Sequence, residues 1–131
     1  MPTTGLYAGA LSLILLFLWS QVSAARMKSG ISILHGDNLD LAYRIRRHAN
    51  FVEHVPMALV LIGILELGGA RPAILHALGG ALTVARVLHP IGIGERKMPN
   101  PLRAIGAGAT FLVILAAAAL ALWQYAARLV S

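Results

Sequence analysis

Residues 43–67 read YRIRRHANFVEHVPMALVLIGILEL, a polar segment that leads directly into a long uncharged one. Residues three or four positions apart share one face of a helix, so Arg46, Asn50 and Glu53 form a polar ladder. The uncharged run of residues 55–65 places Glu53 at or below the lipid headgroups, where an unpaired carboxylate costs at least a few kcal/mol. Glu53 therefore requires a partner: Arg46, a basic residue of another helix, or the ammonium group of a ligand.

The composition of the whole chain favours a membrane protein. Of its 131 residues, 58% are hydrophobic and 12% are charged, whereas soluble domains carry about 25% charged residues. Apart from residues 43–67 the chain holds three further apolar stretches, and crossing a bilayer takes about 20 helical residues. The sequence therefore predicts an all-α membrane protein, a single-domain bundle of four transmembrane helices with spans at about 6–25, 44–67, 73–89 and 102–127.

The basic residues predict an orientation in the membrane. Nine of the 11 flank the link between the first two spans or the link between the last two: Arg26, Lys28, Arg44, Arg46, Arg47, Arg86, Arg96, Lys97 and Arg103. An excess of Lys and Arg marks the cytoplasmic side, so we expect a multi-pass membrane protein with both termini on the non-cytoplasmic side. Because these residues flank apolar runs, nucleic acid is an unsuitable partner despite the net charge of +6.

Turn-forming and small residues predict how the spans connect and pack. Gly68, Gly69 and Pro72 predict a tight turn, so the second and third spans should form an antiparallel hairpin. Small residues within the third and fourth spans would let helices approach closely. They are Gly79, Gly80, Ala81, Gly106 and Gly108.

Two further polar clusters are expected at the same depth as the polar ladder. Arg86 and His89 share a helix face at the end of the third span, and Arg103 stands at the start of the fourth. Together with the ladder they would form a site for a small anionic ligand that also bears an amine. Structural alternatives remain open, since the ladder's ion pair could only fix helix packing and Arg86 and Arg103 could be anchors at the headgroups.

The remaining basic and histidine residues have simpler interpretations. We expect Arg44 and Arg47 to face lipid as anchors in the anionic leaflet. His48 and His54 lack the spacing of a metal site, and the chain has no cysteine to supply thiolate ligands or disulfides. His76 stands alone in the third span and is expected to be a packing residue.

These polar residues carry a resemblance to a known family. The chain resembles the MAPEG family, the membrane-associated proteins of eicosanoid and glutathione metabolism, and in particular its short bacterial members. The resemblance covers about residues 6–127, nearly the whole chain. The matching segments are Arg46-x-His48-x-Asn50-x-x-Glu53-x-x-Pro56, Arg86-x-x-His89 and Pro101-Leu102-Arg103.

The resemblance implies a homotrimer that binds glutathione as co-substrate at each subunit interface near the cytoplasmic leaflet, without a metal. The glutathione-binding residues that it implies are Arg46, Asn50, Glu53, Arg86 and His89. Among these, Glu53 would receive the amino group of the tripeptide. The resemblance also implies a catalytic role for Arg103, whose guanidinium, typically contributed by the neighbouring subunit, would stabilise the glutathione thiolate.

Departures from characterised members narrow the functional prediction. Ala49 replaces an arginine of several eukaryotic members, and Ile93 replaces a tyrosine. Ala104 and Ala107 stand where the prostaglandin synthase type has hydroxyl residues. These losses argue against specific eicosanoid synthesis and favour a microsomal-type glutathione transferase or peroxidase that acts on hydrophobic electrophiles. The alternatives are a non-catalytic binding protein or accessory subunit of an inner-membrane complex, and a small transporter, although transporters place charges at mid-bilayer.

Overall fold

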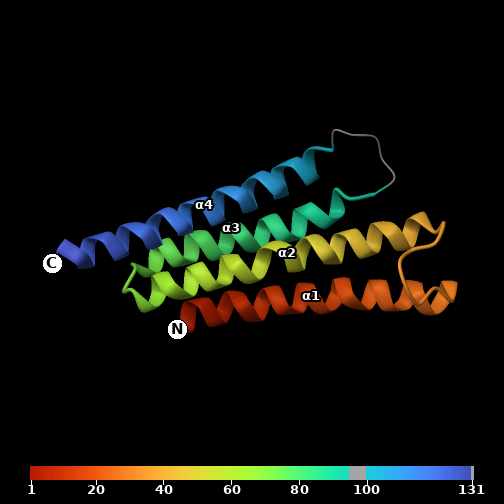
Figure 1. The fold of residues 1–131 in the computed structure, drawn as a ribbon, viewed down its shortest axis with the longest axis horizontal. Coiled ribbons are helices and arrows are strands. Elements are labelled where there is room, and N and C mark those ends of the chain that lie inside the picture. Colours follow the sequence, from red (N-terminus) through yellow and green to blue (C-terminus); the bar gives the residue numbers. More distant parts are fainter. Residues whose placement is uncertain (95–99, 131) are drawn as a thin grey trace.

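The computed structural model describes residues 1–94 and 100–130, which form four α-helices (Figure 1). Each helix is long and apolar enough to cross a membrane, and each predicted span lies within one of them. The all-α, four-helix membrane architecture is therefore confirmed for the described residues. The helices are α1 (Pro2–Ser29), α2 (Leu39–Leu67), α3 (Pro72–Ile91) and α4 (Pro101–Val130).

Local sequence explains where the helices begin and end. The Asn38 side chain accepts a hydrogen bond from the backbone N–H of Leu41 at 3.0 Å and so caps the start of α2. Gly30 closes α1 in the left-handed conformation, with φ of 69°. The predicted tight turn is present, because α2 ends at Leu67 and Pro72 begins α3.

The helices alternate in direction, so both termini lie toward one end of the bundle and the α1–α2 and α3–α4 links lie at the other (Figure 1). Helices α1 and α4 each pack against both helices of the α2–α3 hairpin, on opposite sides of it (Figure 1). We call the end with the two links the basic end and the other the turn end. The described basic residues near the basic end are Arg26, Lys28, Arg44, Arg46, Arg47, Arg86 and Arg103, whereas Arg96 and Lys97 lie outside the described residues.

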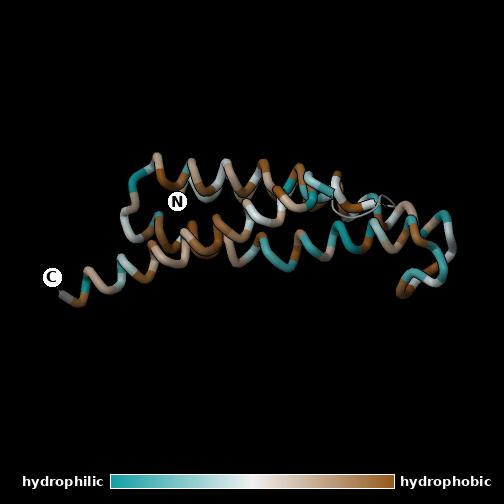
Figure 2. Tube along the Cα trace, turned by 90° about the horizontal axis from the view of Figure 1, so that it is seen from above, coloured by the Kyte–Doolittle hydropathy of each residue, from teal (hydrophilic) through white to brown (hydrophobic). Residues whose placement is uncertain are grey.

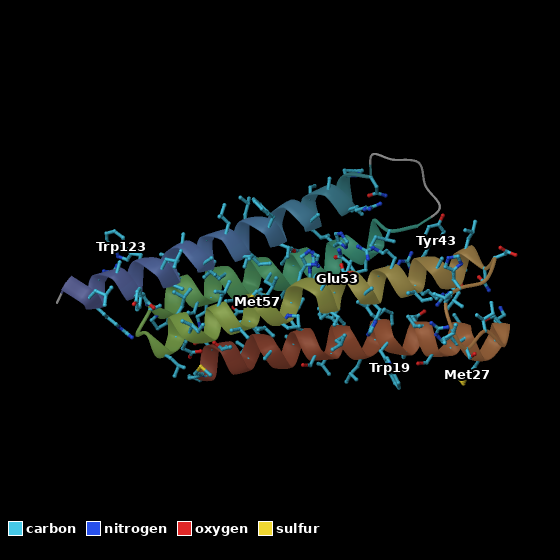
Figure 3. The ribbon with its side chains drawn as sticks, viewed as in Figure 1. Trp19, Met27, Tyr43, Glu53, Met57 and Trp123 are labelled. Carbon is cyan, nitrogen blue, oxygen red and sulfur yellow. The ribbon has the colours of Figure 1, made fainter. Side chains whose placement is uncertain are left out.

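Both the core and the outer faces of the bundle are apolar. The core includes residues of all four helices that are at most 1% exposed, namely Leu11, Ile62, Leu82 and Ala117. Trp19 and Trp123 are 57% and 74% exposed and point away from the bundle (Figure 3). Hydrophilic stretches gather mostly toward the basic end (Figure 2). Such an apolar surface suits lipid, since soluble monomers rarely expose large apolar patches.

Two of the small residues bring helices into close contact, as predicted. A Cβ atom on Gly79 would lie 2.2 Å from Tyr7 Cδ2, and one on Gly106 would lie 2.7 Å from His89 Cβ. Both positions therefore require glycine as packed. Gly108 brings no helices of this chain together, because it lies on the exposed face of α4, where an added Cβ would meet no described atom within 4 Å.

Candidate functional site

The polar ladder of α2 contains an ion pair. Arg46 Nη1 donates to Glu53 Oε1 at 3.0 Å, and Arg46 Nη2 donates to Glu53 Oε2 at 3.3 Å. Of the three partners predicted for Glu53, the structure gives Arg46. Both residues belong to α2, and their side chains are 57% and 46% exposed. Within one chain the pair therefore does not join two helices. Glu53 lies on α2 between Tyr43 and Met57 (Figure 3).

Arg86 is buried, at 2% exposure, although it carries a guanidinium group. Its Nη1 donates to Asn50 Oδ1 at 3.0 Å, and its Nη2 donates to the backbone carbonyl of Gly106 at 3.2 Å. The side chain thus joins α3 to both α2 and α4. The alternative that Arg86 is an anchor at the lipid headgroups is wrong, because such an anchor extends its charged group into the interface.

Both hydrogen-bond acceptors of the buried guanidinium are neutral. The Arg86 Nε atom has no hydrogen-bond partner within the part of the chain that the structure describes. The salt bridges found in residues 1–94 and 100–130 are Arg44–Asp40 and Arg46–Glu53, and neither includes Arg86. A buried cation is costly unless an anion balances it. The position is therefore suited to an anionic ligand.

A small pocket lies beside Arg86 and is lined by residues of α2, α3 and α4. Its volume is about 130 Å³, and its lining includes Asn50, His54, Ala107 and Thr110. Sites for small molecules usually measure about 300–1,000 Å³. This pocket can therefore hold only part of a tripeptide-sized ligand, and the rest of such a ligand would lie on the open face of the polar ladder.

His54 and Thr110 are pocket residues that the sequence did not identify as part of the site. His54 Nδ1 lies 2.8 Å from the backbone carbonyl oxygen of Asn50, and Thr110 Oγ1 donates to the Gly106 carbonyl at 2.8 Å. Each stands four positions after a residue that contacts Arg86, so it shares that residue's helix face. This spacing is the signal that could have identified both.

His89 and Arg103 lie near the same region in different surroundings. His89 is buried, at 4% exposure, in the close contact with Gly106. A Cβ atom on Gly92 would lie 2.3 Å from the backbone nitrogen of Arg103, so the end of α3 that carries His89 lies against the first turn of α4. Arg103 is exposed on the first turn of α4. Direct contact of His89 with a ligand and the catalytic role of Arg103 both stay predictions.

Arg44 and Arg47 bind acceptors of the protein, which corrects the expectation that they only face lipid. Arg44 Nε donates to Asp40 at 2.8 Å, and Arg44 Nη1 donates to Gln21 Oε1 of α1. Arg47 Nε donates to the backbone carbonyl of Ile93 at 2.8 Å. These contacts fix the start of α2 to α1 and to the segment that follows α3.

His76 takes part in a contact between helices at the turn end. The Tyr7 hydroxyl lies 3.0 Å from His76 Nδ1 and 3.1 Å from the His76 carbonyl oxygen. The two rings meet edge to face, with their centroids 5.8 Å apart. His76 therefore packs α3 against α1, which is the structural role expected for it.

Comparison with known proteins connects this site to a family. Residues 4–123, a range that includes all the site residues described above, match the MAPEG family. The chain is 31% identical over 120 residues to the inner membrane protein YecN of Escherichia coli strain K12. The matched region covers 92% of this chain and 90% of that protein. The protein of the same name from Escherichia coli O6:H1 matches with the same identity and coverage. No solved structure gives a significant match. On the family match and the shared identity, this chain belongs to the MAPEG family.

Proposed function

We propose that this protein is a glutathione-dependent enzyme of the inner membrane, of the transferase or peroxidase type, that acts on hydrophobic electrophiles. Membership of the MAPEG family supports this proposal. The inner-membrane name of the Escherichia coli relative and the four membrane-spanning helices support the location. The observation that carries the proposal is the buried Arg86 guanidinium with its two neutral acceptors.

The charges of the candidate site complement those of glutathione. At neutral pH the tripeptide carries two carboxylates and one ammonium group. Arg86 and Arg46 would bind the carboxylates, Glu53 would bind the ammonium, and the Asn50 amide would bind a peptide group of the ligand. The Arg46–Glu53 pair is half exposed, and such pairs contribute only about 0–1 kcal/mol. A zwitterionic ligand can therefore replace the Arg46–Glu53 pair with two ion pairs that are better shielded from water, one between Arg46 and a ligand carboxylate and one between Glu53 and the ligand ammonium.

Arg103 would act on the sulfur atom of the bound tripeptide. A fixed guanidinium in a water-poor site stabilises the thiolate over the thiol. The thiol proton passes to water, the sulfur forms a bond to the electrophilic carbon, and the leaving group departs with the electrons of its bond. With a hydroperoxide, the sulfur attacks the terminal oxygen, and a second glutathione completes the reduction to alcohol, water and glutathione disulfide.

We also propose that the protein is a homotrimer, because the candidate site is open on one side in a single chain. Beyond Glu53, the same face of α2 continues as an apolar stripe formed by Met57, Val60 and Ile64, which are 58%, 55% and 49% exposed. These residues are three or four positions apart and so share one helix face. Packing of a second copy on this stripe would cover it and close the open side of the ligand pocket.

The proposed orientation places the basic end in the cytoplasm. The chain has no cysteine, so Ser32→Cys in the α1–α2 link and Arg71→Cys in the α2–α3 turn each introduce a single thiol at one end. In intact cells, a membrane-impermeant maleimide should label Arg71→Cys and spare Ser32→Cys. The reverse pattern would contradict the orientation.

Purified protein in detergent tests the function directly. Glutathione is supplied with chlorodinitrobenzene or with a lipid hydroperoxide, and product formation is followed. We expect turnover, and also a rise in Tm with glutathione alone, because a ligand that binds the folded state stabilises it. Glutathione sulfonate keeps the charges but lacks the thiol, so it should raise Tm without turnover. Absence of both turnover and a thermal shift would refute the proposal.

A non-catalytic binding protein or accessory subunit is the second candidate, and Ile93 favours it. This residue is buried, at 5% exposure, and it stands where several characterised enzymes of the family have a tyrosine. The position therefore supplies no hydroxyl group to a ligand. A binding protein predicts a thermal shift with glutathione and no turnover with either electrophile, whereas an accessory subunit predicts neither.

A further inference from the structure

A groove runs between α1 and α3, apart from the polar ladder of α2. Two adjoining hollows of about 370 and 330 Å³ form it, and they share Phe17, Leu18, Pro90 and Ile91. Arg86 also contributes to the larger hollow and is the residue that the groove has in common with the pocket described above. The remaining lining residues are different, so the groove is a separate feature.

The part of the groove nearer the middle of the bundle is apolar. Leu13 and Phe17 of α1, with Ile91 of α3, form its walls and are 71%, 61% and 63% exposed, while Leu18 lies at its base and is 5% exposed. Between Leu13 and Gln21, α1 rises by about 12 Å. This is close to half the bilayer hydrocarbon thickness, about 15 Å. The groove therefore has the length and the surface chemistry to hold one acyl chain.

At the basic end the groove becomes polar and carries excess positive charge. Gln21, Arg44 and Arg47 line this mouth. Gln21 and Asp40 accept hydrogen bonds from Arg44, and the Ile93 carbonyl accepts from Arg47, so both guanidinium groups are held in place. Among the described residues, this mouth thus has two cations and one carboxylate beside them, that of Asp40, which is itself 63% exposed.

We propose that the α1–α3 groove binds one anionic glycerophospholipid of the surrounding membrane. The phosphate lies between Arg44 and Arg47, and one acyl chain follows α1 past Phe17 toward Leu13. Basic pockets between transmembrane helices bind anionic headgroups in this way, and each Arg near the surface raises affinity about fivefold. The bound lipid would bridge α1 and α3 on a surface that needs no glutathione, so this proposal stands independently of the enzymatic one.

Native mass spectrometry of the full-length protein in detergent tests the groove. The protein is mixed with equal amounts of phosphatidylglycerol and phosphatidylcholine that carry identical acyl chains, so that only the headgroup differs. We expect one phosphatidylglycerol to be retained per chain, with a preference of at least about tenfold over phosphatidylcholine. Equal retention of the two lipids would overturn the proposal.

Variants distinguish lipid binding in the groove from general attraction of lipid to the basic surface. Arg44→Gln and Arg47→Gln should each lower the preference about fivefold, whereas Arg71→Gln removes a matched charge at the turn end and should leave it unchanged. Val87 also lines the larger, apolar hollow, so Val87→Trp fills this part of the groove and should reduce retention of both lipids. If Arg47→Gln fails to fold, Arg44→Gln and Val87→Trp decide the question. Equal effects of Arg71→Gln and Arg44→Gln would show non-specific attraction and refute the site.

Discussion

At the turn end, polar groups find their partners within the same chain. The Glu66 carboxylate accepts hydrogen bonds from the backbone N–H groups of Thr3 and Thr4, at 3.0 and 2.8 Å, and from the Thr4 hydroxyl at 2.6 Å. An acidic side chain of α2 thereby caps the start of α1, where the unpaired N–H groups favour negative charge. Tyr7 and His76 pair nearby.

At the basic end, the polar groups are satisfied only in part. Arg86 is buried with neutral acceptors, and the Arg46–Glu53 pair is about half exposed. Charged residues kept at such positions in a membrane protein are functional candidates by default. The comparison teaches that Glu66 at the turn end is satisfied by the chain itself, whereas the basic end keeps a buried guanidinium without an anionic partner among the described residues.

The largest expected effect is the loss of turnover in Arg103→Ala, a substitution at the basic end, compared with a matched substitution at the turn end. Loss of a group that stabilises developing charge typically costs about 10²–10³-fold in kcat, so we expect a loss of this size in the glutathione transferase assay. The control is Arg128→Ala, which removes a turn-end cation that donates to the Gly68 carbonyl at 3.2 Å. Turnover that survives Arg103→Ala unchanged would remove Arg103 from the mechanism.

Arg86→Met separates ligand binding from structural support. Removing a buried charge that has no anionic partner relieves a desolvation cost but leaves the Asn50 amide oxygen without its donor, at about 1–3 kcal/mol, so the ligand-free Tm should change little. The thermal shift with glutathione should disappear, which at 100 times Kd is a loss of about 2.7 kcal/mol of stabilisation. A variant with a lower Tm that keeps the full shift would assign Arg86 to the fold instead.

Gly106→Ala tests the packing that holds the Arg86 acceptor in place. Its new Cβ would lie 2.7 Å from His89 Cβ and 2.8 Å from the His89 backbone nitrogen. Overpacking of this kind costs about 1–3 kcal/mol in the free energy of unfolding. Gly108→Ala is the matched control in open space and should be neutral or stabilising by up to about 1 kcal/mol. Equal denaturation midpoints for the two variants would contradict the close α3–α4 contact.

Glu53→Gln and Glu66→Gln are matched substitutions at opposite ends and should have the smallest effects. Glu66→Gln weakens charge-assisted hydrogen bonds at a helix start, so it should lower Tm and leave the glutathione Kd unchanged. Glu53→Gln breaks a half-exposed pair worth at most about 1 kcal/mol, so it should raise Kd with little change in Tm. A lower Tm for Glu53→Gln together with a raised glutathione Kd for Glu66→Gln would contradict the roles given to the two ends.

Much of the fold could be predicted from the sequence because length, apolar composition and charge position are local properties. The four spans and the turn before Pro72 follow from such features. The Arg46–Glu53 pair follows from helical spacing along one helix. These contacts need no knowledge of which helices are neighbours.

The partners between helices could not be predicted in this way. The outer faces of these helices are apolar as well as the inner ones, so the sequence pattern does not show which face meets which neighbour. Arg86 is buried partly because its acceptor is the backbone carbonyl of Gly106, a group that no side-chain pattern reports. Arg47 likewise binds a backbone carbonyl, that of Ile93.

The Gly106 carbonyl accepts hydrogen bonds from both Arg86 and Thr110, and Arg103 stands three positions before it on α4. A carboxylate that bound the Arg86 guanidinium in place of this carbonyl would leave Thr110 as the side chain that donates to it. On the proposed function, a thiol that lacks the matching carboxylate should leave the Arg86–Gly106 hydrogen bond in place and bind more weakly than glutathione.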